Sequence, residues 1–289
     1  MCEYKILCSL FDVTIFGNMS LSFESEGINL EYEIIGSGEK PMFAFHGFSN
    51  SSEMFRVLEP SLGKKYTIYS FNLPYHGAST VDEETTVYGI DTLQLQKYFK
   101  NFLWHIHSSY FSLLGYSIGG KVALKLIELF PEEVNDVFLF APDGIKLSFW
   151  YRFITRTMPG KWIYKRLMLH PHRYLSFVNV FGKLKLVHPR TADFIRSSLD
   201  TSEKREMVYN TWMCLRNLDP AINQIQNIIN RKNMNFHLFF GKYDKIIPAF
   251  IGKNFVKGLR NKKCLYLVDA GHQMVKEKMN DDLERILSS

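Results

Sequence analysis

One stretch, residues 111–130, restricts the fold of this chain more than any other segment. Apolar residues lead into the pentapeptide Gly-Tyr-Ser-Ile-Gly at 115–119, and the residues after it place Lys121, Lys125 and Glu128 on one helical stripe. This pattern predicts a buried strand, a tight turn and a helix. A serine at such a turn has a strained backbone, and the glycines let strand and helix approach closely. The pentapeptide could also occur by chance in a loop, but this context predicts that Ser117 is a nucleophile and that the Ile118 amide faces a developing oxyanion.

Strands and helices alternate on both sides of a long interruption. We predict strands at 20–24, 30–35, 41–45, 66–71, 111–114, 137–140, 236–240 and 265–268. Helices are predicted at 52–62, 86–107, 121–130, 248–259 and 281–287. Between residue 146 and about residue 230 the periodicity is helical throughout. The chain is therefore predicted to have an α/β fold, a mostly parallel doubly wound sheet with an all-helical insert.

The same pattern divides the chain into segments. Residues 1–18 continue neither the strand nor the helix pattern, and Met19 stands directly before the first convincing strand. We therefore expect a loosely attached leader at 1–18, a core formed by 19–145 and 231–289, and an insert at 146–230. The four cysteines have no metal or redox spacing, and no apolar run has the length of a transmembrane helix. These features favour a reducing, cytoplasmic location.

The positive charge of the chain is concentrated in the insert. Residues 144–190 contain ten Lys or Arg residues and no Asp or Glu, whereas the whole chain carries a net charge of +6. Aromatic residues are interleaved with these basic residues. The segment could attract an anionic substrate, a thioester carrying phosphates or an anionic membrane surface. Alternatively, its aromatic residues pack on the core while its basic residues keep the outer face soluble. Nucleic-acid binding is not expected, because no recognised module accompanies the charge.

Two further polar residues follow strands of the predicted sheet. Asp244 comes just after the strand at 236–240, and His272 comes just after the strand at 265–268. Because the loops that follow parallel strands meet at one edge of a sheet, these residues should lie near Ser117. A serine hydroxyl needs a base to take its proton, and the base needs an acid to orient it. The favoured acid is Asp244, and the alternative acid is Asp143, which follows the strand at 137–140.

The order Ser, Asp, His, with each residue after a strand, resembles the α/β-hydrolase superfamily. The resemblance covers nearly all of the chain from Met19 onward. It rests on four motifs together: His46-Gly47-Phe48, the pentapeptide at 115–119, Gly241-Lys-Tyr-Asp244 with Pro248, and Gly271-His272. Within the superfamily, the chain is similar to the serine-nucleophile enzymes with a helical cap, such as carboxylesterases and methyl-ester esterases.

The resemblance implies roles for individual residues. The Phe48 amide would be the second oxyanion donor beside the Ile118 amide, and His46 would hold its loop in place. Ser117, His272 and Asp244 would then be nucleophile, base and orienting acid. The insert would correspond to the cap that shapes the substrate pocket of this superfamily.

These expectations combine into one function. We expect a serine hydrolase that cleaves a small-molecule carboxylic ester or thioester through an acyl-enzyme on Ser117, without a cofactor. Two alternatives stay open at this point. One is a lyase or C–C bond hydrolase that uses the same residues, and the other is a non-catalytic descendant of the fold.

Overall fold

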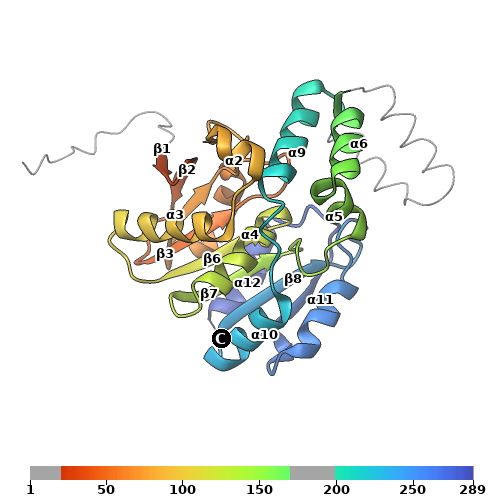
Figure 1. Ribbon diagram of the computed structural model, residues 1–289. Coiled ribbons are helices and arrows are strands. Elements are labelled where there is room, and N and C mark those ends of the chain that lie inside the picture. The colour runs from red at the N-terminus through yellow and green to blue at the C-terminus, as the bar shows by residue number, and fades with distance from the viewer. Residues whose placement is uncertain (1–20, 170–198, 289) are drawn as a thin grey trace, which may run out of the picture.

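The computed structural model describes residues 21–169 and 199–288 (Figure 1). These ranges hold nearly all of the predicted core and both ends of the predicted insert. The predicted leader at 1–18 lies outside the described residues, as does the middle of the insert.

A nine-stranded sheet forms the centre of the molecule, in the order β1-β2-β4-β3-β6-β7-β8-β9 with β5 beside β2. The strands are β1 Leu21–Ser25, β2 Ile28–Ile35, β3 Lys40–Phe45, β4 Tyr66–Phe71, β5 Thr80–Val81, β6 Phe111–Tyr116, β7 Val134–Phe140, β8 Asn235–Gly241 and β9 Leu265–Val268. Neighbours from β4 to β9 pair in parallel, whereas β2 pairs antiparallel with β1, β4 and β5. The predicted mostly parallel sheet is confirmed.

The burial of the strands follows their place in the sheet. β6 is buried along its whole length and β3 is buried from Pro41 to Phe45, because both lie in the middle of the sheet and are covered on both faces. β2 alternates between buried and partly exposed residues, as expected for a strand with one covered face.

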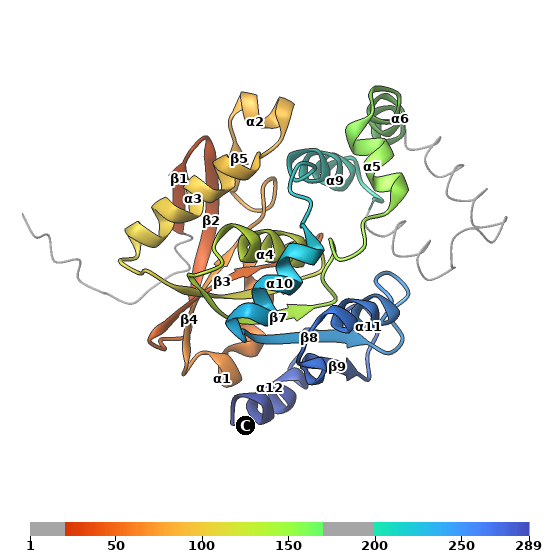
Figure 2. The same cartoon turned by 60° about the horizontal axis from the view of Figure 1, so that its bottom comes forward.

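Helices cover both faces of the sheet. The core helices are η1 Ser52–Leu58, α1 Glu59–Leu62, α2 Glu83–Tyr88, α3 Thr92–His105, α4 Ile118–Leu129, α10 Ile222–Lys232, α11 Phe250–Phe255 and α12 Met279–Leu287, with short 3-10 turns at η2 Val256–Gly258 and η3 Lys262–Cys264. Figure 2 shows α1 and α12 together on one side of the sheet and α3, α4 and α10 on the other. The doubly wound arrangement predicted from the sequence is therefore present.

The helix predicted at 86–107 is two helices in the structure. Gly89 has a φ of 77° and ends α2, and Asp91 begins α3 with a capping box to Gln94. Glycine adopts this φ without steric cost, and an aspartate followed three residues later by glutamine satisfies the free amides of a new helix. The break is thus caused by the residues that end one helix and begin the next, which helical periodicity alone does not reveal.

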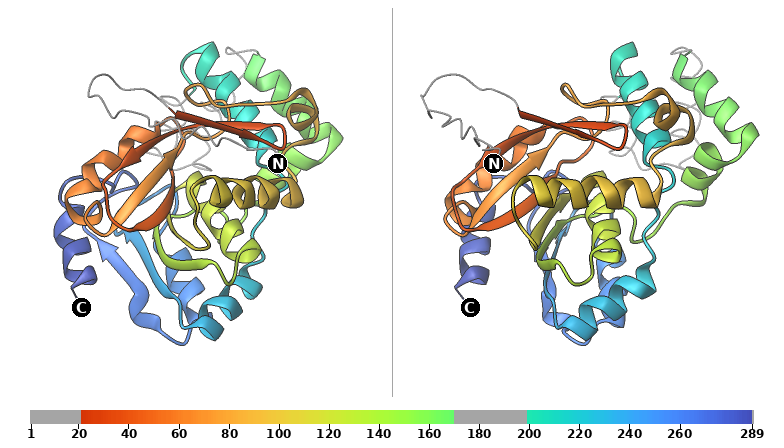
Figure 3. Two further views of the ribbon diagram at one scale, coloured as in Figure 1. Left: turned by 90° about the vertical axis from the view of Figure 1, so that its left-hand side faces the viewer. Right: turned by 60° about the vertical axis from the view of Figure 1, so that its left-hand side comes forward.

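The described part of the insert contains α5 Phe149–Arg156, α6 Met158–Leu169 and α9 Ser202–Cys214. α5 packs against α6, and α6 packs against α9, around a small apolar cluster of their own. Both views in Figure 3 show these helices together at one end of the core. α10, by contrast, packs against α4 and buries Ile225, Ile228 and Ile229 in the main core. We therefore propose that the insert ends near Pro220, earlier than the predicted residue 230.

Candidate active site

Ser117 occupies the tight turn between β6 and α4. Its backbone has φ 53° and ψ −120°, a conformation that few non-glycine residues adopt. The glycines around it have a steric reason: a Cβ on Gly119 would lie 2.0 Å from the carbonyl oxygen of Phe45, and a Cβ on Gly120 would lie 2.4 Å from the Cβ of Pro142. α4 therefore lies this close to the end of β3 and to the loop after β7 only because these positions lack a side chain.

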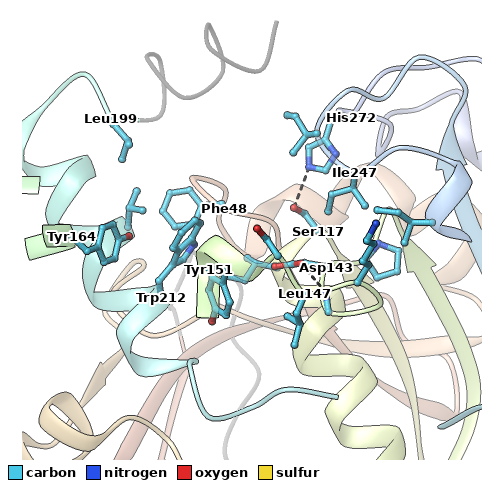
Figure 4. A pocket seen from close by; sticks show the side chains of 18 residues that line it. Phe48, Ser117, Asp143, Leu147, Tyr151, Tyr164, Leu199, Trp212, Ile247 and His272 are labelled. Carbon is cyan, nitrogen blue, oxygen red and sulfur yellow. Dashed lines mark hydrogen bonds between the residues drawn. The ribbon is translucent and has the colours of Figure 1, made fainter. Parts of the chain in front are cut away.

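A continuous chain of hydrogen bonds runs from Ser117 through His272 to Asp244. The distance from Ser117 Oγ to His272 Nε2 is 3.1 Å (Figure 4), and that from His272 Nδ1 to Asp244 Oδ2 is 2.7 Å. Because a carboxylate oxygen accepts, Nδ1 carries the proton, and Nε2 is then free to accept the serine hydroxyl. The order β6-β7-β8-β9 brings the three loops to one edge of the sheet, as the sequence predicted.

The carboxyl group of Asp244 is held from its other side. Oδ1 accepts hydrogen bonds from the amides of Ile246 and Ile247, at 2.8 and 2.9 Å. The Asp244 side chain is fully buried and that of His272 is nearly so. This turn therefore fixes Oδ2 in the direction of the imidazole.

Asp143, the alternative acid, lies in the same region but makes other contacts. Its amide donates to the carbonyl oxygen of Ser117 at 2.8 Å, and its Oδ1 accepts from the amide of Gly144 at 2.7 Å. Burial raises the pKa of Asp143, and nearby Lys121 opposes that rise. The geometry thus favours Asp244 over Asp143 as the partner of His272.

Two residues beside Ser117 have a backbone amide without an acceptor in the regular structure around it. Ile118 is the first residue of α4, so its N–H has no acceptor within the helix. The amide of Phe48 likewise has no hydrogen-bond acceptor among residues 21–169 and 199–288. Both residues line the cavity that also exposes Ser117 and His272. Two residues that carry such an amide therefore line the same cavity as the serine.

His46 holds the loop that carries Phe48. The residue is completely buried, its Nδ1 donates to the carbonyl oxygen of Gly47 at 2.7 Å, and its Nε2 accepts from the amide of Leu73 at 3.0 Å. Burial, and secondarily nearby His76, lower the pKa of His46 to about 3. His46 is therefore neutral at physiological pH, in keeping with the structural role expected of it.

A cavity of about 400 Å³ opens onto Ser117 and His272. Figure 4 shows Tyr164, Leu199 and Trp212 on one side of it and Ile247 on the other. The lining is mostly aromatic and aliphatic. Of the basic side chains in the described part of the insert, only Lys146 lines this cavity. Such a cavity suits an apolar group.

Lys121 has a role that the sequence did not reveal. It is buried, and its Nζ donates to the Tyr151 hydroxyl at 2.9 Å and to the carbonyl oxygen of Leu215 at 3.0 Å. Nζ also lies 3.3 Å from Asp219 Oδ1, and Asp219 pairs with Arg156 at 2.7 Å. Burial lowers the pKa of Lys121, while Asp143 and Asp219 oppose that change. Lys121 thus fastens α4 of the core to the insert.

We expect Lys121→Met to destabilise the protein by about 3 kcal/mol, because the buried Tyr151 hydroxyl and Leu215 carbonyl lose their donor and Asp219 keeps only the more exposed Arg152 and Arg156 as partners. Urea unfolding followed by circular dichroism measures the free energy of unfolding. Lys97→Met is the matched control: Lys97 is 54% exposed, lies 3.8 Å from Glu26, and should change stability by no more than about 0.5 kcal/mol. Equal stability of the two variants would contradict the assigned role.

Tyr116 is a second residue that the sequence did not single out. Its hydroxyl donates to the carbonyl oxygen of His272 at 3.1 Å, and its ring centroid lies 5.3 Å from that of the imidazole. Because Tyr116 precedes Ser117 in the turn, it connects the serine loop directly to the histidine loop.

No helix among the described residues is both long enough and apolar enough to cross a membrane.

Comparisons with known proteins agree on one fold. A family model described as "alpha/beta hydrolase fold" matches residues 40–278. The uncharacterized hydrolase YugF of Bacillus subtilis is 26% identical over 89% of this chain and 92% of its own length. The pimeloyl-[acyl-carrier protein] methyl ester esterase of Hamiltonella defensa is 22% identical over 90% of this chain and 96% of its own length. A putative lipase from Acinetobacter baumannii superposes with a TM-score of 0.62 at 18% identity, covering 93% of this chain and 90% of that structure.

Proposed function

Because the chain belongs to the α/β-hydrolase fold family, we propose that this enzyme is a serine hydrolase that cleaves a carboxylic ester or thioester through an acyl-enzyme on Ser117. The proposal rests on the chain of hydrogen bonds from Ser117 through His272 to Asp244. Ser117 and His272 line a mostly apolar cavity. That a relative of similar length is a methyl ester esterase supports an ester as the substrate.

In the proposed first half-reaction, Ser117 Oγ attacks the carbonyl carbon while His272 Nε2 takes the hydroxyl proton. The oxyanion that forms would receive hydrogen bonds from the amides of Phe48 and Ile118, aided by the positive end of α4. The tetrahedral intermediate then expels the alcohol or thiol, which takes the proton from His272. Asp244 keeps the imidazole oriented and stabilises its charged form.

In the second half-reaction, water replaces the alcohol or thiol. His272 takes a proton from the water, the hydroxide attacks the acyl carbonyl, and the same two amides stabilise the new oxyanion. When this intermediate collapses, the carboxylic acid leaves and Ser117 Oγ regains its proton from His272. Nucleophile, base, orienting acid and oxyanion donors all come from the chain, so the proposed reaction needs no cofactor.

The lining of the cavity supports an apolar acyl group rather than an anionic one. Each methylene that enters such a cavity is stabilised by about 0.8 kcal/mol, which corresponds to roughly a fourfold gain in kcat/KM. In a series of p-nitrophenyl esters, kcat/KM should therefore rise with chain length beyond acetate and fall once the cavity is full. Rapid quenching and intact mass should detect the acyl group on the protein. A lyase that used the same residues would give no acyl-enzyme.

Val208 offers a sharper test of this assignment, because it lines the cavity from α9. Val208→Phe should move the best substrate to a shorter ester, since the larger side chain takes up part of the space. Val87→Phe is the matched control: Val87 is 61% exposed and lies outside the cavity. A length profile that neither variant changes would contradict the assignment of the cavity to the acyl chain.

A further inference from the structure

We propose that the outer face of α5 and α6 is a docking surface for an anionic lipid bilayer. This face, called the docking face below, is formed by Phe149, Trp150, Met158, Trp162, Lys165 and Arg166. Its four apolar side chains are 74%, 67%, 81% and 62% exposed, in sequence order. Large apolar side chains gathered on two consecutive helices indicate a surface that another phase or molecule covers.

On α5, the two aromatic side chains of the docking face pack on each other and on Phe153. The ring centroids of Phe149 and Trp150 lie 5.8 Å apart, and those of Trp150 and Phe153 lie 6.0 Å apart. Tyr151, between them in sequence, points the other way and holds Lys121. One side of α5 therefore contacts the core through Tyr151, and the opposite side carries aromatic rings. Tryptophan and phenylalanine beside basic residues are the composition of helices that lie in a membrane interface.

The positive charge of the docking face favours an anionic partner. The guanidinium of Arg166 lies 5.1 Å from the centroid of the Trp162 ring, and neither Lys165 nor Arg166 forms an ion pair within the described residues. Between residues 144 and 190 the sequence contains ten basic residues and no acidic one, so this segment is uniformly positive. An anionic lipid surface supplies the missing charge, whereas a second copy would bring the same positive charges against each other.

The docking face belongs to the helices of the described insert that lie farther from the core. α6 packs against α9 and α9 packs against α2 of the core, so α5 and α6 are the outer helices (Figure 2). The segment that leads into α5 contributes Lys146, Leu147 and Ser148 to the lining of the cavity. A bilayer on the docking face would therefore lie close to the cavity, where an amphiphilic ester could enter. The docking itself does not depend on the chemistry of Ser117.

Vesicle binding by the full chain tests this proposal. We expect it to sediment with vesicles of phosphatidylcholine and phosphatidylglycerol, more weakly at high salt, and little with phosphatidylcholine alone. Tryptophan emission should shift to the blue on binding. Replacing Phe149, Trp150 and Trp162 by serine together should weaken partition at least about tenfold, because their insertion supplies the apolar part of the affinity. Lys165→Glu with Arg166→Glu should remove the preference for the anionic vesicles.

The matched control is Trp104→Ser on α3, because Trp104 is 80% exposed but lies outside the insert. It should bind vesicles as the wild type does. Absence of wild-type binding, or an equal loss in the Trp104 variant, would overturn the proposal. Self-association that only the triple serine variant removes, without vesicle binding, would instead identify a contact between copies. Ser117→Ala should lose activity yet bind vesicles normally, so failure of the proposed function and failure of docking are distinguishable.

Discussion

Ser117→Ala is expected to reduce kcat/KM for a p-nitrophenyl ester by roughly 10⁴- to 10⁶-fold. The reason is that Oγ forms the covalent bond to the acyl group, and neither His272 nor a bound water replaces it efficiently. A residual rate above the uncatalysed reaction should persist, because the amides of Phe48 and Ile118 would still stabilise an oxyanion. Initial rates at several substrate concentrations give the ratio directly.

Ser148→Ala is the matched control for this substitution. Ser148 lines the same cavity, is exposed and makes no side-chain capping hydrogen bond to α5. Its removal should change kcat/KM less than about threefold, within the small range usual for exposed positions. A fluorophosphonate probe should label the wild type and Ser148→Ala but not Ser117→Ala. If Ser117→Ala kept activity within tenfold of the wild type, the acyl-enzyme mechanism would be wrong.

The central part of the fold could be predicted because its signals are local and strong. The apolar runs that became β3 and β6 are buried on both faces, and the runs of alternating residues became β1 and β2 at one edge. β5 has two residues and pairs only with β2, so its formation depends on a distant partner rather than on its own sequence. The split between α2 and α3 was missed because two capping residues, Gly89 and Asp91, outweigh helical periodicity.

The candidate site was predictable to a similar extent. Loops after parallel strands meet at one edge, so the chain order alone was enough to expect Ser117, Asp244 and His272 together. Sequence could not choose firmly between Asp143 and Asp244, since both follow neighbouring strands. The choice depends on side-chain directions that are set by the amides of the turn after β8. The contacts of Lys121 with the insert, and the shape of the cavity, depend on how the insert packs on the core. No sequence motif predicts that packing.

Because Asp244 rather than Asp143 is hydrogen-bonded to His272, we expect its substitution to have the second large effect on activity. Asp244→Asn should reduce kcat about 10²- to 10⁴-fold, because an asparagine amide can donate to Nδ1 of His272 and so favour the tautomer in which Nε2 carries the proton. In that tautomer Nε2 cannot accept the hydroxyl proton of Ser117. Fluorophosphonate labelling of Ser117, which needs the same base, should slow in proportion. The free energy of unfolding should be measured as well, because the amides of Ile246 and Ile247 keep an acceptor only if the asparagine oxygen takes the place of Oδ1.

Asp143→Asn is the control that separates an orienting acid from a nearby carboxyl group. The asparagine oxygen can still accept from Gly144, and the backbone bond from residue 143 to the Ser117 carbonyl is unaffected. We therefore expect kcat to fall less than about tenfold, together with a change in stability caused by the loss of a negative charge near Lys121. The reverse order, with the larger loss of kcat in Asp143→Asn, would assign the acid to the loop after β7. His272 would then have to turn away from Asp244 during catalysis, and a structure of the acylated enzyme would show that rotation.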